Sequence, residues 1–103
     1  MKKGEIWWAE IPSPVGKRPA LLLTRDEAYS FRTNVTIAPL TTTIRKIPTC
    51  VHLSETDGVP KKCVVNLDSI YTIEKGLLKT KICDLSEEKM HLVNKAIRFA
   101  LDI

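Results

Sequence analysis

Residues 15–24 read Val15-Gly16-Lys17-Arg18-Pro19-Ala20-Leu21-Leu22-Leu23-Thr24, and the rest of the chain is organised around them. Pro19 suits the first residue of a strand, where its missing N–H does no harm, and the leucines that follow are most simply a buried strand. The residue before a proline is held in extended backbone, so Arg18 lies on a restrained piece of chain after a flexible glycine. This stretch predicts a guanidinium at the edge of a sheet, which is a good place to hold an anion.

The composition is that of an ordinary globular protein. The 103 residues are 44% hydrophobic and 27% charged. This length is enough for one domain with a core of its own and too short for two, so we expect a single domain spanning residues 1–103. No apolar run has the length of a membrane span, and the first five residues, MKKGE, contain no apolar segment typical of a secretory signal. We therefore expect a cytoplasmic protein with no membrane partner.

The net charge of +4 is unevenly distributed along the chain. Residues 1–50 hold eight Lys and Arg against four Asp and Glu, whereas residues 51–103 hold eight of each. The surplus lies in the half that contains Arg18, which is a weak indication of nucleic-acid binding. The three cysteines are widely spaced and form no C-x-x-C pair, so the sequence predicts no metal site, no disulfide framework and no cofactor.

Alternating and β-branched segments predict a chain made mainly of short strands. We expect strands at residues 4–11, 19–25, 34–38 and 49–53, and one long or two short strands within residues 63–73. Pro39 is expected to end the third strand and to begin a long bend that reaches Pro48. After Gly76, residues 77–78 form only a short apolar piece.

The C-terminal segment changes to the period of a helix. Ser86 is a good N-cap, Glu87 and Glu88 occupy the first turn, and Leu85 and Met90 have the spacing of a hydrophobic staple. Apolar residues then recur at helical spacing: Met90, Val93, Ile97 and Leu101. Five or six strands followed by one helix predict a mainly β fold, a small curved antiparallel barrel of the SH3-like or OB-like kind.

Two clusters of anion-binding side chains flank the second and third predicted strands. Lys17 and Arg18 precede one strand, and Thr41-Thr42-Thr43 with Arg45-Lys46 follow the next. If these strands are antiparallel neighbours, the start of one lies beside the end of the other, and Arg18 and Thr41 share one rim of the sheet. Guanidinium groups match phosphate oxygens, and threonine hydroxyls often contact phosphate. Two unrelated, solvated loop clusters are the alternative interpretation.

In their order along the chain, these segments resemble the MazF/PemK/Kid family of bacterial toxin endoribonucleases. The resemblance covers essentially the whole chain through GEIWWAEI (4–11), VGKRPALLLTR (15–25), VTIAPLTTT (35–43), IPTCVHL (47–53), VVNLDSIYTI (64–73) and LSEEKM (85–90). Its most specific parts are KRPALLL and APLTTT at their mutual spacing.

The resemblance implies a homodimer of SH3-like antiparallel barrels of the plasmid-maintenance-toxin type, with single-stranded RNA along the subunit interface. It implies metal-independent cleavage in which the ribose 2′-hydroxyl attacks the adjacent phosphorus, giving 2′,3′-cyclic phosphate and 5′-hydroxyl ends. A small antitoxin with a flexible acidic segment would cover the RNA groove. The family's catalytic arginine and threonine match Arg18 and Thr41. The residues expected to bind RNA are Lys17, Thr42, Thr43, Arg45, Asp68 and Ser69.

The sequence also departs from the family pattern. Residues 13–17 form a shorter loop than is usual and contain no carboxylate, so either Arg18 takes both proton-transfer roles or an acid from elsewhere, such as Asp68, contributes. Ser69 stands where the family often has glutamine, which bears on base recognition. Two other functions stay open: a nucleic-acid-binding barrel that does not cut, and a protein-targeting toxin on the related gyrase-poison fold.

Overall fold

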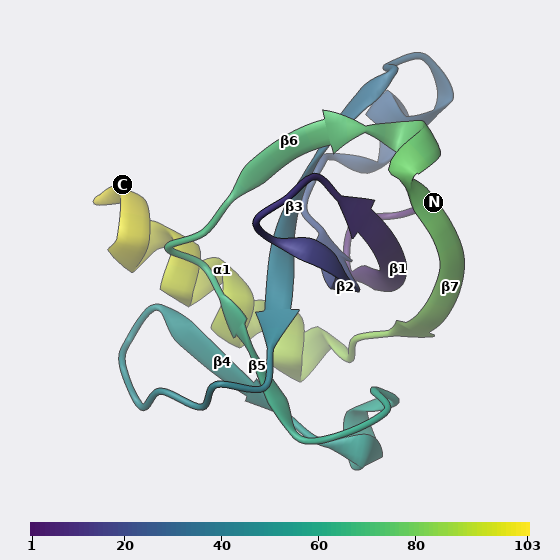
Figure 1. Cartoon of the computed structure of the whole chain (residues 1–103). Helices are drawn as coiled ribbons and strands as arrows, with labels where there is room; N and C mark the ends of the chain where they lie inside the picture. Colours follow the sequence, from purple (N-terminus) through teal and green to yellow (C-terminus); the bar gives the residue numbers. More distant parts are fainter.

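The computed structural model describes residues 1–103 and contains seven strands, three short 3₁₀ helices and one α-helix (Figure 1). The strands are β1 (Glu5–Ile11), β2 (Gly16–Leu22), β3 (Asn34–Thr41), β4 (Cys50–Leu53), β5 (Cys63–Asn66), β6 (Tyr71–Glu74) and β7 (Leu78–Asp84), and helix α1 covers Glu87–Leu101. All strand pairs are antiparallel. The prediction of a mainly β fold with a C-terminal helix is confirmed.

Strand β3 is the centre of the sheet and changes partner along its length. Its first half pairs with β6, and Ile37 to Pro39 pair with β2. Leu40 and Thr41 instead pair with Val65 and Val64 of β5. The sheet order is therefore β4-β5-β3-β2-β1-β7, and β6 also pairs with β3, on the edge opposite β2, because Ile37 pairs with both Leu22 and Tyr71. The pairing of β2 with β3 ends at Ala20 and Pro39. The first residues of β2 and the last residues of β3 are therefore not paired with each other.

The strands bury residues on both faces because the sheet curves around two cores. Leu21 and Leu22 are both 0% exposed, and they belong to different hydrophobic clusters. Neighbouring strand residues point to opposite faces, so the continuous apolar run of β2 serves both clusters. Helix α1 closes the larger cluster with Val93 and Ala96. Each fully buried leucine contributes roughly 1.5–3 kcal/mol to folding.

Three sequence predictions about strands are wrong. The second strand does not run from Pro19 to Arg25, because β2 spans Gly16–Leu22 and already contains Arg18; Pro19 is tolerated inside β2 because pairing with β3 starts only at Ala20. Pro39 does not end the third strand, which continues to Thr41; a proline is tolerated there because β3 is leaving β2 at this point and pairs with β5 from Leu40 onward. The apolar piece at residues 77–78 leads into the seven-residue strand β7. Most of β7 is polar and exposed, and its pairing with β1 is interrupted by two register shifts, so its sequence shows no alternation.

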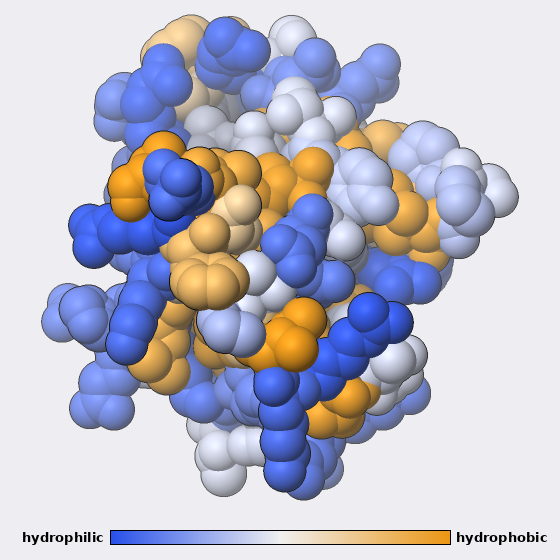
Figure 2. Space-filling view, turned by 90° about the vertical axis from the view of Figure 1, so that its left-hand side faces the viewer, coloured by the Kyte–Doolittle hydropathy of each residue, from blue (hydrophilic) through white to orange (hydrophobic).

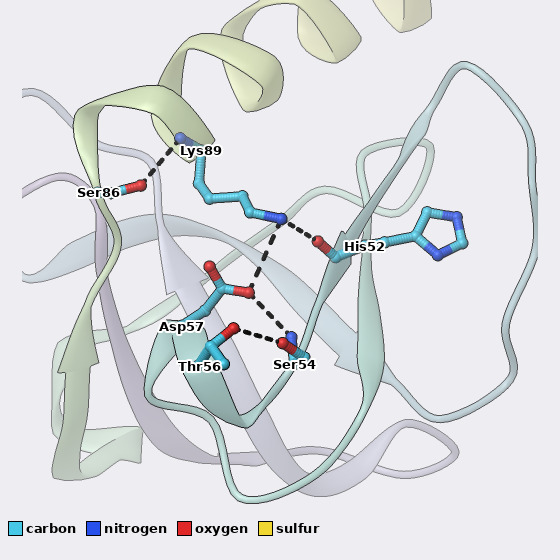
Figure 3. A network of polar contacts seen from close by, with 6 residues as sticks. All are labelled: His52, Ser54, Thr56, Asp57, Ser86 and Lys89. Carbon is cyan, nitrogen blue, oxygen red and sulfur yellow. Dashed lines mark hydrogen bonds and ion pairs between the residues drawn. The ribbon is translucent and has the colours of Figure 1, made fainter.

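Helix α1 begins as predicted and is tied to β4 by a lysine. The Ser86 hydroxyl accepts a hydrogen bond from the Lys89 backbone N–H at 3.1 Å. The Lys89 ammonium donates to the carbonyl oxygen of His52 at 2.8 Å and lies 3.7 Å from Asp57 Oδ2, which also accepts the Ser54 N–H at 2.9 Å (Figure 3). The helix is too short and too polar to serve as a membrane span.

Several large apolar side chains are exposed near the C-terminal end of the chain. On the side where this end lies, Figure 2 shows apolar patches between charged groups. The exposed residues of α1 and its end are Leu92, Phe99, Leu101 and Ile103. Ile44 and Ile47, in the loop between β3 and β4, are 40% and 42% exposed.

Candidate active site between strands β2 and β3

The register of the sheet brings Arg18 and Thr41 together. Ala20 pairs with Pro39 and Leu21 with Ala38, so Arg18 and Thr41 each lie two residues beyond the last pair of β2 and β3, at the same end of the two strands. Strands β2 and β3 have diverged there, and two adjoining cavities occupy the space. Arg18 and Thr41 are the only residues that line both of them. Arg18 and Thr41 therefore lie at the same rim of the sheet, as the sequence predicted.

The first cavity, which we call the Trp8 cavity, has a volume of about 270 Å³. Besides Arg18 and Thr41, its polar lining comes from Lys17, Thr42 and Lys61. Apolar and thiol groups complete it: Trp8, Pro19, Leu40, Val59, Pro60 and Cys63. The Arg18 side chain lines the cavity, and its Nε atom is buried and has no hydrogen-bond partner within the chain. An unpaired buried donor is costly until an acceptor reaches it.

The second cavity, which we call the Tyr71 cavity, has a volume of about 370 Å³. Three of the predicted RNA-binding residues line it: Thr43, Arg45 and Ser69. Asn66 and Tyr71 also line it and were not predicted. They come from β5 and β6, at the two ends of one short connection, and Tyr71 is 38% exposed.

The lining of the two cavities is cationic. Lys17, Arg18, Arg45 and Lys61 all contribute to it, and none of them forms an ion pair within the chain. No Asp or Glu lines either cavity. Guanidinium and ammonium groups without internal partners are free to make charge-assisted hydrogen bonds to an anion such as a phosphodiester.

The hydroxyl of Thr41 is oriented by its own loop. Its oxygen accepts a hydrogen bond from the Thr43 N–H at 3.2 Å, as Thr side chains do in turns. The hydroxyl hydrogen makes no bond within the chain and remains available for an acceptor in the cleft.

Asp68 lies outside both cavities. Its carboxylate accepts a hydrogen bond from the Thr49 hydroxyl at 2.6 Å, and its backbone N–H donates to Asn66 Oδ1 at 3.0 Å. These bonds hold the turn between β5 and β6 against the residue that precedes β4. A contact between Asp68 and RNA stays a prediction that this geometry does not test.

The buried thiols at the cavity walls are poor nucleophiles. Cys63 lines the Trp8 cavity and Cys50 lines the Tyr71 cavity, and both are free. Burial raises the pKa of each thiol above its ordinary value, with a further increase from Asp68 at Cys50 and from Asp57 at Cys63. Both cysteines therefore stay protonated near neutral pH.

Sequence reasoning missed Lys61, Asn66 and Tyr71. The two adjacent tryptophans have different surroundings, because Trp7 donates its indole N–H to Glu5 Oε1 at 2.8 Å while Trp8 lines the Trp8 cavity. Lys61 lies in a turn 43 positions after Arg18, so no local spacing connects the two.

Comparison with known proteins identifies the class of this chain. The family described as "PemK-like, MazF-like toxin of type II toxin-antitoxin system" matches residues 2–101. The chain belongs to this family, as the resemblance of its motifs implies, and the predicted toxin-type barrel is confirmed with it.

Individual relatives agree over nearly the full length. The probable endoribonuclease MazF5 of Mycobacterium tuberculosis is 34% identical over 101 residues, which are 97% of this chain and 92% of the relative. The solved structure of the Mycobacterium tuberculosis toxin MazF-mt6 superposes with a TM-score of 0.89 at 33% identity, covering 96% of this chain and 97% of that one. A mycobacterial endoribonuclease solved in complex with its cognate antitoxin gives a TM-score of 0.89 at 26% identity, covering 100% and 96%.

Proposed function

We propose that this endoribonuclease toxin cuts single-stranded RNA at the boundary between the Trp8 cavity and the Tyr71 cavity. Its family and its relatives named endoribonucleases support the activity. One observation supports the location: Arg18 and Thr41, and no other residues, line both cavities. A phosphodiester held between these two side chains has room for one flanking nucleotide on each side.

The chemistry that fits this cleft uses a nucleophile supplied by RNA. The ribose 2′-hydroxyl attacks the adjacent phosphorus, the bond to the 5′-oxygen breaks, and a 2′,3′-cyclic phosphate and a 5′-hydroxyl result. The chain has to align the 2′-hydroxyl and to stabilise charge on the phosphorane. The Arg18 guanidinium, which lines both cavities, and the free hydroxyl hydrogen of Thr41 supply donors for its oxygens.

In this proposal Arg18 relays the proton: its guanidinium donates one proton to the leaving 5′-oxygen and takes up the one that the 2′-hydroxyl releases, so Arg18 ends in its starting charge state. Of the two sources that the sequence left open, Arg18 lies in the cleft, whereas Asp68 lines neither cavity and is bonded to Thr49. Lys17, Thr42, Thr43, Arg45 and Ser69 hold the flanking phosphates and bases. Lys61 joins them from the turn before β5.

The proposal includes two protein partners in the cytoplasm. A cationic cleft without internal ion pairs suits a flexible acidic segment of an antitoxin, and a structural relative is described in complex with its cognate antitoxin. The exposed apolar residues of α1 and of the β3–β4 loop suit contact with a second copy of the chain. Translation and growth would stop until the antitoxin binds.

Arg18→Ala tests the assignment. Loss of one donor to the phosphorane costs about 2.7–4 kcal/mol, so cleavage of a long RNA in EDTA is expected to fall roughly a hundredfold to a thousandfold in kcat while the urea midpoint stays unchanged. Arg32→Ala is the matched control, because Arg32 is exposed and lies outside both cavities.

Each alternative predicts a different result. Normal turnover by folded Arg18→Ala excludes the catalytic assignment. A wild-type protein that binds RNA and leaves it intact is a non-catalytic binder. Topoisomerase inhibition that persists in Arg18→Ala indicates a gyrase-poison-like toxin.

A further inference from the structure

We propose that the Tyr71 cavity is a nucleobase site that selects a keto base, uracil or guanine, through the side-chain amide of Asn66. The inference rests on the proposed function, because it places a nucleotide next to the phosphodiester held by Arg18 and Thr41. It adds the chemical identity of one base of the substrate.

The orientation of the Asn66 amide is set by the backbone. Asn66 Oδ1 accepts the Asp68 N–H at 3.0 Å, and the Asn66 carbonyl accepts the Ser69 N–H at 3.2 Å. A backbone N–H can only donate, so the amide oxygen must face Asp68 and the NH₂ group must face away from it. This NH₂ makes no hydrogen bond within the chain, and Asn66 lines the cavity. Asn66 therefore offers donors to an occupant while its acceptor is engaged.

The other polar groups of the cavity favour the same occupant. Arg45 and Arg18 are donors only, and the hydroxyls of Thr43 and Ser69 either donate or accept. The lining contains no carboxylate. Uracil presents O4 and guanine presents O6 where cytosine and adenine carry an amino group. An amino group facing the Asn66 NH₂ sets donor against donor, so the site discriminates against cytosine and adenine.

Tyr71 provides a surface on which a base can stack. Tyr71 is 38% exposed, is the first residue of β6 and lies opposite Ile37 of the central strand β3. Single-stranded RNA is recognised by splayed bases that stack on aromatic side chains and are read on their edges. The volume of about 370 Å³ leaves room for one base and ordered water.

The test exchanges one base of an RNA oligonucleotide and compares the kcat/KM values for the different bases as a ratio. Wild-type protein is assayed on oligonucleotides that differ only in one base beside the cleavage site, and kcat/KM is expected to favour U or G over C and A by about tenfold or more at one position. Asn66→Asp keeps an oxygen for the Asp68 N–H and removes the NH₂ donors. It is expected to lower this ratio at that position by about tenfold and to leave the ratios at other positions unchanged.

A control variant is needed because Asn66→Asp also introduces a negative charge, which repels RNA whatever its bases are. Thr42→Asp adds the same charge in the Trp8 cavity, where Thr42 but not Asn66 is found. It is expected to slow cutting of all the oligonucleotides alike and to keep the keto preference. An unchanged ratio in Asn66→Asp overturns the inference, and so does a wild-type protein that prefers C or A at every position beside the cut.

Binding measurements give a readout that does not depend on cleavage. Oligonucleotides with a 2′-deoxy nucleotide at the cleaved position cannot react, and their Kd values are expected to show the same keto preference. If the wild type binds with this preference and does not cut, the proposed function fails while the base site stands. Tyr71→Ala is the second variant, and it is expected to weaken Kd about tenfold through lost stacking. Unchanged affinity in Tyr71→Ala contradicts a stacked base.

Discussion

At the scale of single residues, Glu5 shows how a buried charge is held in this fold. Its side chain is 9% exposed, it accepts the Trp7 indole N–H at 2.8 Å, and it lies 3.4 Å from the Lys81 ammonium, which also pairs with Asp84 at 3.0 Å. Burial raises the pKa of this carboxyl, but the Trp7 hydrogen bond and the charge of Lys81 outweigh burial, so the pKa ends below its ordinary value of 4.5. The charged form is therefore the one that the fold stabilises.

We expect Glu5 to contribute to stability at neutral pH and to lose that contribution in acid. A carboxyl with a lowered pKa in the folded state stabilises it above the unfolded value of 4.5 and ceases to do so as pH falls through the folded value. Glu5→Gln is expected to lower the free energy of unfolding at pH 7 by about 1–2 kcal/mol. The free energy of unfolding of this variant is also expected to fall less steeply than that of the wild type as pH drops below 4.5. Urea unfolding at several pH values measures this.

The exposed Glu10 of the same strand is the matched control. Glu10 forms no ion pair, so Glu10→Gln is expected to leave the decline unchanged. Equal pH profiles for Glu5→Gln and the wild type would contradict the role given to Glu5.

At the scale of elements, the contact between α1 and β4 depends on Lys89. The Lys89 and Asp57 side chains are 29% and 13% exposed, so their attraction is less screened than that of a surface pair. Lys89→Met keeps most of the aliphatic stem and removes the bonds to Asp57 and to the His52 carbonyl (Figure 3). We expect it to destabilise the fold by about 1–2 kcal/mol and to speed hydrogen exchange in α1, measured at one protein concentration.

Lys95→Met provides the comparison on the same helix. The Lys95 side chain is exposed and forms no hydrogen bond or ion pair, so its replacement is expected to change stability by less than about 0.5 kcal/mol. Equal effects of the two substitutions would show that the Lys89 contacts add nothing to the fold.

The elements also show what sequence can and cannot predict here. Helix α1 was predictable because its signals are local: the Ser86 cap and the apolar spacing that buries Val93. Strand β7 was not, because it is defined by hydrogen bonds to β1 across two register shifts rather than by its own polar residues. The change of partner in β3 at Leu40 is likewise set by the distant strand β5.

The same distinction holds for the candidate site. Arg18 and Thr41 were paired in advance because antiparallel neighbours fix which ends meet. Asn66 and Tyr71 were missed because they belong to β5 and β6. Only the folded sheet places those two strands beside the point where the pairing of β2 with β3 ends. Asp68 lies in the same turn as Asn66 but outside the cavity, and neighbouring positions in a turn cannot be told apart from sequence.

At the scale of the whole molecule, the four cations of the cleft that form no ion pair come from three separate segments of the chain. Together they predict a salt-dependent affinity for RNA. Each phosphate neutralised on a single strand contributes about −0.7 to the slope of log K against log salt. Lys61→Ala is therefore expected to make the slope for an uncleavable oligonucleotide less steep by about 0.7.

Lys62→Ala is the matched control, because Lys62 is exposed and lines neither cavity, and it is expected to keep the wild-type slope. Equal slopes for the two variants would mean that RNA responds to the net charge of +4 and not to the cleft.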